Sequence, residues 1–511
     1  MKVGARGQVA EWRGASRRVF WIVAITTSAL QSVYPQPQLN LPQCQLEDLM
    51  ESQKLGISPT GVQNNVTLLP SDVLLLIFEE FVSDRLHLPW PQAQYDSERA
   101  HAPFVLAQVC NLWRQLALET ASLWAYLGFP DSSQPIAELE LRIARGKDTP
   151  VDIYFQLRSF SPNSDGARCI ARLHMIAPRW RQVHIDYPQN NDLEDIPPAW
   201  LTECATPYLH SLTLNSFATG VYDSPTLHGV LPHAPRLRRV FFDDIAINWE
   251  LHNRSAAAIT YISIYICSWP ADMFYTFLSP VAQTLKTLAL LGRSGQLYDI
   301  APAQADPPRR LILPNLIRLV LHDTQWLGHI RTPNLRRLEF CTSSLDPSRE
   351  LLLQPLVSID TLVLWGYVPA SLLGHVQSFV NVTHLKFAVA SESYQIYGHG
   401  WEGDNSIVPA EFLNCLSGTS SEALIWPQLQ RVSFGNDSDP LPQRVEVDLE
   451  SLTSLVHRGR DSNKETKQLQ LHVAPTVVSH ELRDAVEQLM RTEPDRRVKS
   501  PRETLQDQVN T

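Results

Sequence analysis

The chain has 511 residues, with 43 basic and 53 acidic side chains and a formal net charge of −10 at pH 7. This length is too great for one compact core and indicates several domains or one elongated array. A hydrophobic content of 44% predicts a folded chain, while the acidic balance argues against a protein whose whole surface binds nucleic acid or anionic lipid. Because the 37 prolines outnumber the 21 glycines, we expect prolines to mark the starts and ends of many elements.

The N-terminal segment carries basic residues before an apolar run from Val19 to Leu30, which superficially resembles a secretory signal. As a helix this run would be about 18 Å long, shorter than the roughly 30 Å core of a bilayer. We therefore predict no membrane span and expect residues 1–65 to be partly disordered. The seven cysteines are odd in number and form no C-x-x-C pair, so no disulfide framework or zinc site is predicted. A cytoplasmic or nuclear protein is expected, and a signal peptide is the alternative.

A helical module is predicted over residues 66–128. Pro70 suits a first helical turn and Asp72 favours the positive end of the helix dipole, so a helix is predicted to begin there. A second helix is predicted from Phe104 to Leu118, after which Leu123 and Trp124 pack back on the unit. Both helices are so apolar that they need either a partner or the domain behind them, and periodicity alone leaves these two readings open.

The same residues resemble a known family. The runs Leu69-Pro70-x-Asp72-Val73-Leu74-x-x-Ile77-Phe78, Val109-Cys110-x-x-Trp113-Arg114-x-Leu116-Ala117 and Leu123-Trp124 are similar to an F-box of the type common in mushroom-forming (basidiomycete) fungi. The chain departs from the shortest F-boxes by the insert from Ser83 to Ala102. The resemblance implies a module that docks a Skp-type adaptor and, through it, the cullin of a ubiquitin ligase. By position, the residues that would contact the adaptor or support that contact are Leu69, Pro70, Leu74, Ile77, Phe78, Val109, Cys110, Trp113 and Leu116.

A repeat follows, with apolar residues at positions a, a+3 and a+5. The ten anchors at position a are Trp180, Leu209, Leu237, Ile259, Leu285, Leu316, Leu335, Ile359, Val382 and Leu429. Their mean spacing lies within the range of roughly 20 to 29 residues that is typical of leucine-rich repeats. The predicted fold class is therefore α/β, a short N-terminal helical F-box module followed by an irregular leucine-rich-repeat-like solenoid over residues 139–475. An ordinary buried sheet is the alternative, and the long last step predicts an insert or a degraded repeat.

Two further features of the repeat carry predictions. Proline stands two positions before six of the anchors and is expected to end the preceding element and lead the chain into the strand extended. Residues at a+3 and a+5 are predicted to point inward, and those at a+2 and a+4 to face the open side of the sheet. The outward residues are Arg239, Phe241, Tyr261, Arg318, Arg337, Glu339, His384, Lys386 and Arg431.

The outward residues are mostly basic, although the chain is acidic. Because the guanidinium group matches carboxylate and phosphate geometry, we hypothesise that this face binds an acidic or phosphorylated peptide segment. The substrate-binding candidates are Arg239, Tyr261, Arg318, Arg337, Lys386 and Arg431. Ordinary solvated strand positions are the alternative.

No motif predicts catalysis. Residues Gly398 to Gly403 match G-x-G-x-x-G, but no long helical pattern follows, so we interpret them as an insert loop. No metal-ligand spacing or cofactor motif is present. Near the C-terminus, Ser479 precedes an amphipathic pattern that predicts a capping helix over 479–491, and residues 493–511 are predicted to be a disordered tail.

The sequence thus favours a non-catalytic substrate-recognition subunit of a Skp–cullin–F-box type ubiquitin ligase. Its expected partners are the adaptor, the cullin behind it and an unknown protein substrate, with no nucleic acid, no membrane, no metal and no cofactor. The alternatives are a repeat-based interaction scaffold with no ligase association, and an enzyme built on the repeat array.

Overall fold

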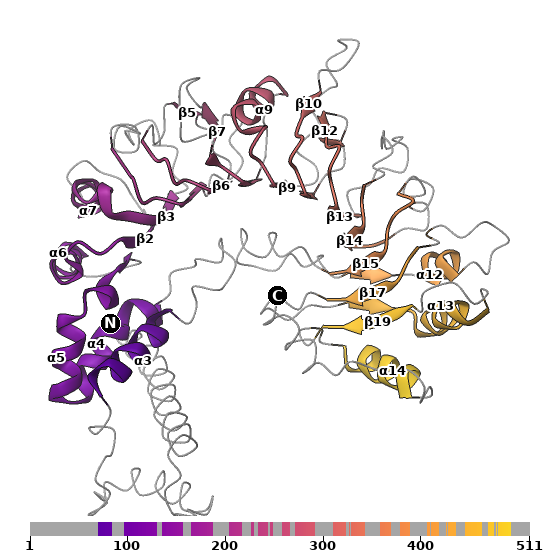
Figure 1. Cartoon of the computed structure of the whole chain (residues 1–511), viewed down its shortest axis with the longest axis horizontal. Coiled ribbons are helices and arrows are strands. Elements are labelled where there is room, and N and C mark those ends of the chain that lie inside the picture. Colours follow the sequence, from indigo (N-terminus) through magenta and orange to yellow (C-terminus); the bar gives the residue numbers. More distant parts are fainter. Residues whose placement is uncertain are drawn as a thin grey trace, which may run out of the picture. The chain divides into compact units, whose positions relative to one another are not determined.

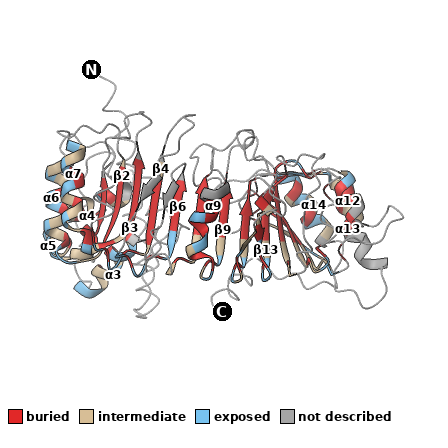
Figure 2. Cartoon of the chain, turned by 90° about the horizontal axis from the view of Figure 1, so that it is seen from above, coloured by how far each residue is buried: buried red, intermediate tan, exposed pale blue. Residues whose placement is uncertain are grey.

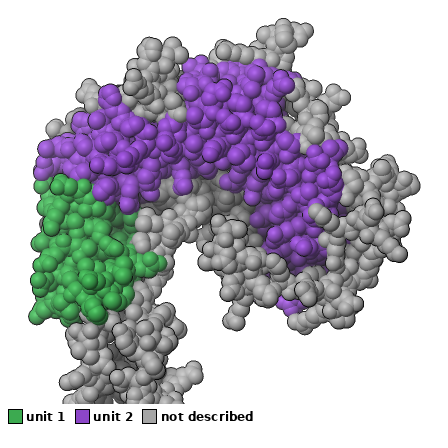
Figure 3. Space-filling view, viewed as in Figure 1, with its two compact units in different colours: residues 1–89, 95–128, 137–149 green, residues 90–94, 129–136, 150–511 purple. Residues whose placement is uncertain are grey.

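The structure is a computed structural model of the chain, and the residues it describes fall into two compact units (Figure 3). Unit 1 comprises residues 1–89, 95–128 and 137–149, and unit 2 comprises residues 90–94, 129–136 and 150–511. The described ranges are 70–83, 97–129, 135–156, 165–187, 204–216, 226–228, 233–243, 246–248, 258–265, 271–291, 310–322, 326–327, 329–342, 358–368, 372, 379–388, 406–408, 410–417, 426, 428–435, 445–461, 469–474, 477 and 479–491. The predictions for residues 1–65, Leu69, the loop from Gly398 to Gly403 and the tail 493–511 lie outside these ranges.

Unit 1 contains a small helical bundle. Its elements are α3 (Ser71–Ser83), α4 (Ser97–Val109), α5 (Asn111–Glu119), the 3-10 helix η2 (Ala121–Trp124), β1 (Tyr126–Phe129) and α6 (Pro135–Gly146). As expected, α3 begins directly after Pro70, whose carbonyl accepts the N–H groups of Val73 and Leu74 at 3.0 and 3.1 Å.

The prediction of one helix from Phe104 to Leu118 was wrong, because the helix is interrupted at Cys110. This residue has extended backbone angles, φ −158° and ψ 173°, and separates α4 from α5. The break leaves carbonyls at the end of α4 without helical partners, and Arg114 Nε donates to one of them, that of Ala107, at 3.0 Å. The Arg114 side chain thus replaces one of the main-chain hydrogen bonds that the break removes.

The core of unit 1 joins α3, α4 and α5 to η2. Phe78 of α3 packs edge-on against Trp113 of α5, with ring centroids 4.8 Å apart, and Trp124 lies edge-on to Phe104 of α4. The Trp124 indole N–H also donates to the carbonyl of Ala117 at 2.7 Å. The prediction that Leu123 and Trp124 pack back on the helices is therefore confirmed.

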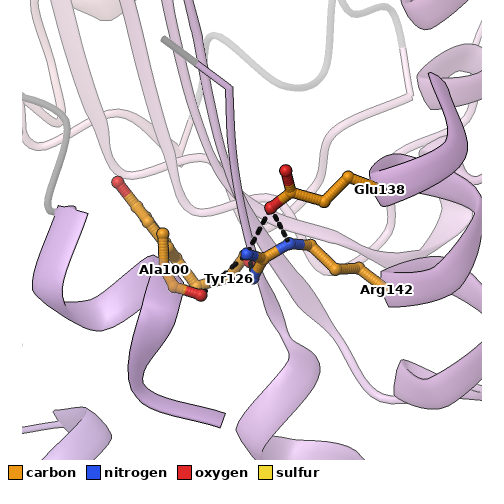
Figure 4. Close-up of polar contacts among 4 residues, drawn as sticks. All are labelled: Ala100, Tyr126, Glu138 and Arg142. Carbon is orange, nitrogen blue, oxygen red and sulfur yellow. Dashed lines mark hydrogen bonds and ion pairs between the residues drawn. The ribbon is translucent and has the colours of Figure 1, made fainter. Parts of the chain in front are cut away.

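A buried arginine ties α6 to the rest of unit 1 (Figure 4). The Arg142 side chain is 0% exposed and donates to Glu138 Oε1 from Nε at 3.0 Å and from Nη2 at 2.6 Å. Its remaining donors reach the carbonyls of Ala100 at 2.7 Å and of Tyr126 at 3.3 Å. A buried charge is stable only when it is paired and hydrogen-bonded, and these four bonds meet that requirement. The sequence did not reveal this clamp.

Unit 2 is built on a parallel sheet whose strands follow each other in the order β2-β3-β4-β6-β8-β9-β11-β13-β14-β15-β17-β19. The bounds of these strands are β2 (Val151–Gln156), β3 (Trp180–Tyr187), β4 (Ser211–Ser216), β6 (Arg239–Asp243), β8 (Tyr261–Tyr265), β9 (Thr287–Leu291), β11 (Arg318–Leu321), β13 (Arg337–Cys341), β14 (Thr361–Trp365), β15 (His384–Phe387), β17 (Arg431–Phe434) and β19 (Gln470–Val473). Each strand pairs in parallel with the next, from β2 to β19.

Helices and short strand pairs fill the connections between these strands. They are α7 (Asp165–Met175), η3 (Ala177–Arg179), β5 (Thr226–His228), β7 (Ala246–Asn248), α9 (Ala271–Leu278), η6 (Ser279–Val281), β10 (Leu311–Ile312), β12 (Ile330–Arg331), β16 (Ser406–Val408), α12 (Ala410–Ser417), β18 (Val445–Val447), α13 (Leu449–Asp461) and α14 (His480–Arg491). In Figure 1, α9, α12 and α13 lie on the outer side of the sheet.

The repeat pattern places every predicted strand. Nine of the ten anchors are followed by a strand that starts at a+2, and the strand of the first anchor starts at Trp180 itself. The side chains at a+3 and a+5, such as Leu288 and Leu290, are fully buried or nearly so. The fold is therefore α/β with one large parallel sheet, and its single-strand repeat is of the leucine-rich type.

The prolines before the anchors act as turn residues. In four described cases, those of Pro207, Pro235, Pro314 and Pro333, the anchor N–H bonds to the carbonyl of the residue before the proline, at 3.1 to 3.4 Å. This is a β-turn with proline at its second position, where the fixed φ of the ring is favourable. In these four repeats the proline therefore stands within a turn that leads into the strand, which refines the expectation that it ends the preceding element.

A row of polar side chains at position a−1 links successive repeats. Each donates to a main-chain carbonyl of the preceding repeat: Thr284 Oγ1 to Ile259 at 2.8 Å, Asn315 Nδ2 to Gln283 at 2.6 Å, Asn334 Nδ2 to Pro314 at 2.8 Å and Ser358 Oγ to Leu335 at 2.7 Å. We call these four side chains the a−1 ladder. They satisfy carbonyls that the turns leave without partners.

The pairing of the last strands explains the long spacing between the final two anchors, Val382 and Leu429. Since β15 pairs directly with β17, residues between them form an insert that contains β16 and α12 rather than another strand of the sheet. One further strand, β19, follows β17 and was not predicted. After it, Ser479 Oγ accepts the N–H of Leu482 at 3.3 Å and caps α14, which matches the predicted helix.

Candidate functional site

The residues proposed to contact an adaptor separate into a core set and a surface set. Leu74, Phe78 and Trp113 are at most 3% exposed and belong to the core of unit 1. They can support a contact surface but cannot themselves contact a partner. Pro70 and Val109 are exposed, and Ile77, Cys110 and Leu116 are half-buried.

The most exposed apolar side chain of α3 was not among the candidates. Leu76 is 66% exposed, and Val109 at the end of α4 is 48% exposed. The i+2 spacing from Leu74 to Leu76 places the two residues on different sides of the helix, which is the signal that could have identified Leu76. The two exposed residues, with Pro70, make up what we call the apolar surface of unit 1.

The second candidate is the open face of the main sheet, formed by the side chains at a+2, a+4 and a+6. The a+2 side chains are half-buried or exposed from Arg239 onward, as predicted. The a+4 residues of this face are nevertheless buried, since Phe241, Glu339 and Lys386 are at most 8% exposed. Parallel strands lie only about 4.8 Å apart, so an a+4 side chain is enclosed by its same-face neighbours. Figure 2 shows the strands buried over most of their length, with exposed residues along the edge where they begin.

A polar network occupies the N-terminal end of the open face. Asp186 accepts hydrogen bonds from Tyr154 Oη at 2.5 Å and from Asn215 Nδ2 at 2.9 Å, and its Oδ1 lies 2.7 Å from His184 Nε2. The rings of Tyr154 and His184 stack with centroids 4.6 Å apart. Burial alone would raise the pKa of Asp186, but the charge and hydrogen bonds of His184, with those of Tyr154 and Asn215, bring it below the usual value. We call these four residues the aspartate network.

The neighbouring strands also pair their charges internally. Arg181 makes a bidentate ion pair with Asp152, Nε to Oδ1 at 2.7 Å and Nη2 to Oδ2 at 2.6 Å. The hydrogen bond to Asp152 raises the pKa of Arg181. At this end of the sheet, therefore, the charged groups are already matched within the protein.

In the middle of the sheet, two of the predicted substrate-binding arginines share one carboxylate. Arg318 Nε and Arg337 Nε lie 2.5 and 2.6 Å from the same oxygen, Glu339 Oε1. Although burial opposes ionisation, the charges of Arg318 and Arg337 lower the pKa of Glu339 to about 2. The structure therefore brings these candidates together, but around an internal anion that the sequence reading had treated as an isolated outward residue.

An apolar cluster lies beside this triad on the open face. It consists of Tyr265, Ala289, Leu291, Val320, Cys341 and Trp365, all at most 4% exposed. These residues occupy positions a+4 and a+6, so the face has a second core that the repeat pattern did not predict.

The C-terminal end of the open face is basic. His384 on β15 is level with Arg431 on β17, and its Nε2 lies 2.8 Å from Ser433 Oγ. Burial, followed by the positive charges of Arg431, Lys386 and Arg337, lowers the pKa of His384 to about 4. The two remaining substrate candidates, Arg239 and Tyr261, lie level on β6 and β8, away from this group.

The buried thiols of unit 2 are candidate nucleophiles. Burial raises the pKa of the Cys169 and Cys204 thiols to about 11, so neither is an activated nucleophile. Among the described residues, no three histidine, cysteine or acidic side chains are grouped so that they could hold a metal ion. No described helix is both long and apolar enough to cross a membrane.

Comparison with known proteins gives a limited result. No family model matches the chain, and none of the curated proteins matches it. A solved structure of a TLR13–ssRNA13 complex is similar to 64% of this chain at 10% identity, with a TM-score of 0.29. The match covers 45% of that protein, less than half its length. The description of the fold rests on the strand register given above and not on this likeness.

Proposed function

We propose that the protein is a non-catalytic substrate-recognition subunit of a ubiquitin ligase, with unit 1 docking a Skp-type adaptor and the repeat array holding a protein substrate. The F-box-like residues of the sequence suggest this function. The observation that carries it is the apolar surface of unit 1, because Leu76 and Val109 remain exposed beside a complete core. Exposed apolar side chains on a helix are a common means of docking into a partner's groove.

The division of the candidates into two sets refines the proposal. Direct contact is assigned to Pro70, Leu76 and Val109, together with the half-buried Ile77 and Leu116. Leu74, Phe78 and Trp113 hold the helices in place, so changing them would test folding rather than docking. Docking then depends on side chains that can be altered without loss of the core.

Co-purification with the Skp-type adaptor tests the proposal. Leu76→Ser and Val109→Ser should each weaken adaptor binding about tenfold, the effect of removing one well-buried apolar contact. Leu141→Ser is the matched control, because Leu141 is a 40% exposed leucine of unit 1 that lies on α6. Binding affinity is measured with purified full-length chain and adaptor.

Failure of the wild-type protein to bind the adaptor would contradict ligase membership. Equal losses in all three variants would instead show that docking does not use the apolar surface of unit 1. In the first case the second candidate function applies, that of a repeat-based interaction scaffold. The large sheet of unit 2, with its charged open face, favours protein binding in either case.

A further inference from the structure

The basic residues at the C-terminal end of the open face lie in one row. Arg337, Thr361, His384 and Arg431 are successive Cα partners across β13, β14, β15 and β17. With about 4.8 Å between strands, the two arginines are roughly 14 Å apart at Cα, so their long side chains can reach a group lying between them. Lys386 is two residues farther along β15 on the same face, at the level of Ser433.

The donors of these arginines are only partly used. Arg337 bonds Glu339 through Nε, which fixes its guanidinium group while its side chain stays 35% exposed. Arg431 is half-buried, and its side chain forms no hydrogen bond or ion pair with the residues that the structure describes. An arginine held at a partly enclosed position without a counter-ion has lost some of its hydration and gains from a bound anion.

The described strands of this region carry more basic than acidic side chains on the open face. On β11 to β17 the open face carries Arg318, Arg337, Lys386 and Arg431 against the single acid Glu339. The pKa of His384 is depressed by burial and by the charges of Arg431, Lys386 and Arg337, which lie near the same ring. Asp360, at the edge of the row, accepts a hydrogen bond from Thr361 at 2.8 Å.

We propose that this row is an anion site in which Arg337 and Arg431 bind a carboxylate or phosphate group on an extended segment of a partner protein. Glu339 is a positioning residue, since it holds Arg337 through Nε and does not occupy the terminal Nη donors. The buried charge of Lys386 adds to the positive potential. The inference extends the proposed function, because the bound segment would belong to the substrate, and it narrows the predicted basic face to this end of the sheet.

Peptide binding to the purified full-length chain tests the site. Three fluorescent peptides are compared that differ only at their charged positions, which hold glutamate, phosphoserine or glutamine. The wild-type protein should bind at least one of the two anionic peptides and should not bind the glutamine peptide. A preference between the glutamate and phosphoserine peptides tells which source supplies the anion.

Variants then locate the binding. Arg337→Gln and Arg431→Gln should each weaken binding about tenfold, as expected for loss of one charge-assisted contact. Arg331→Gln is the matched control, since Arg331 is an exposed arginine on β12, outside the main sheet. Equal binding of all three peptides, or an equal loss in the Arg331→Gln variant, would overturn the proposal.

Adaptor binding, measured on the same preparations, separates this inference from the proposed function. Variants that lose peptide binding but retain adaptor binding confirm that unit 1 is intact. If the wild-type chain binds the anionic peptides selectively but does not bind the adaptor, the anion site stands and ligase membership fails.

Discussion

The two ends of the open face use charge in opposite ways. At the N-terminal end, Asp186 accepts from Tyr154 and Asn215 and pairs with His184, and Asp152 pairs with Arg181. At the C-terminal end, Arg431 has no such partner among the described residues. The strands are of the same kind and the positions within the repeat are equivalent. The first end thus satisfies its polar groups within the protein, whereas we propose that the second keeps Arg431 for binding.

Removal of the carboxylate from the aspartate network should produce the largest effect. Asp186→Ala would leave His184, Tyr154 and Asn215 without their common acceptor, two of them buried. Breaking a buried charged network costs on the order of 4 kcal/mol. The free energy of unfolding in urea measures this. A loss below that of the Arg431→Gln variant would show that the two ends of the face do not differ.

The shared carboxylate in the middle of the sheet gives a second, pH-dependent prediction. The pKa of Glu339 lies at about 2 in the folded protein, against 4.5 as the ordinary value. Its contribution to stability, on the order of 3 kcal/mol, is therefore complete above pH 4.5 and is lost as the pH falls towards 2. Glu339→Gln should lower stability at neutral pH and flatten its dependence over this acid range.

Unfolding curves of the wild type and the Glu339→Gln variant between pH 7 and the acid limit of folding test this linkage. Glu446→Gln is a suitable control, because Glu446 is an exposed acid on β18. If the stability of the Glu339→Gln variant depended on pH as steeply as that of the wild type, the two arginines would not be lowering the pKa of this carboxyl group.

The smallest effect on stability is expected at the basic end. Arg431→Gln should change the free energy of unfolding by less than about 0.5 kcal/mol, as is usual for partly exposed residues with no ion pair. The same urea experiment measures it. A loss of several kcal/mol would show that Arg431 is a structural residue, and the contrast with Asp186 would then fail.

The positions of the strands could be predicted, whereas the pairing of polar groups could not. Anchors such as Leu285 and Leu316 stand two residues before their strands. They can be recognised because burial at a, a+3 and a+5 is a pattern contained in a short stretch of sequence. The Arg318–Glu339 contact depends on two residues 21 positions apart whose alignment is set by the register of β11 and β13. No local pattern carries that information. The break at Cys110 was also missed, because an apolar helical period continues through it.

The candidate site shows the same limit. The i+2 spacing of Leu74 and Leu76 places them on different sides of one helix, but only the packing of unit 1 shows how far Leu76 remains exposed while Leu74 is enclosed. Likewise, the burial of Arg142 could not be inferred from a helix that reads as amphipathic.

The a−1 ladder has a mechanical consequence. Its four side chains join consecutive repeats without a gap, from the one anchored at Ile259 to the one anchored at Ile359. A joint with a side-chain hydrogen bond in addition to the strand pairing resists shear between neighbours more than one held by pairing alone. The central repeats are therefore held in register by side-chain hydrogen bonds as well as by strand pairing, and sliding one of them past the next would break both sets of bonds.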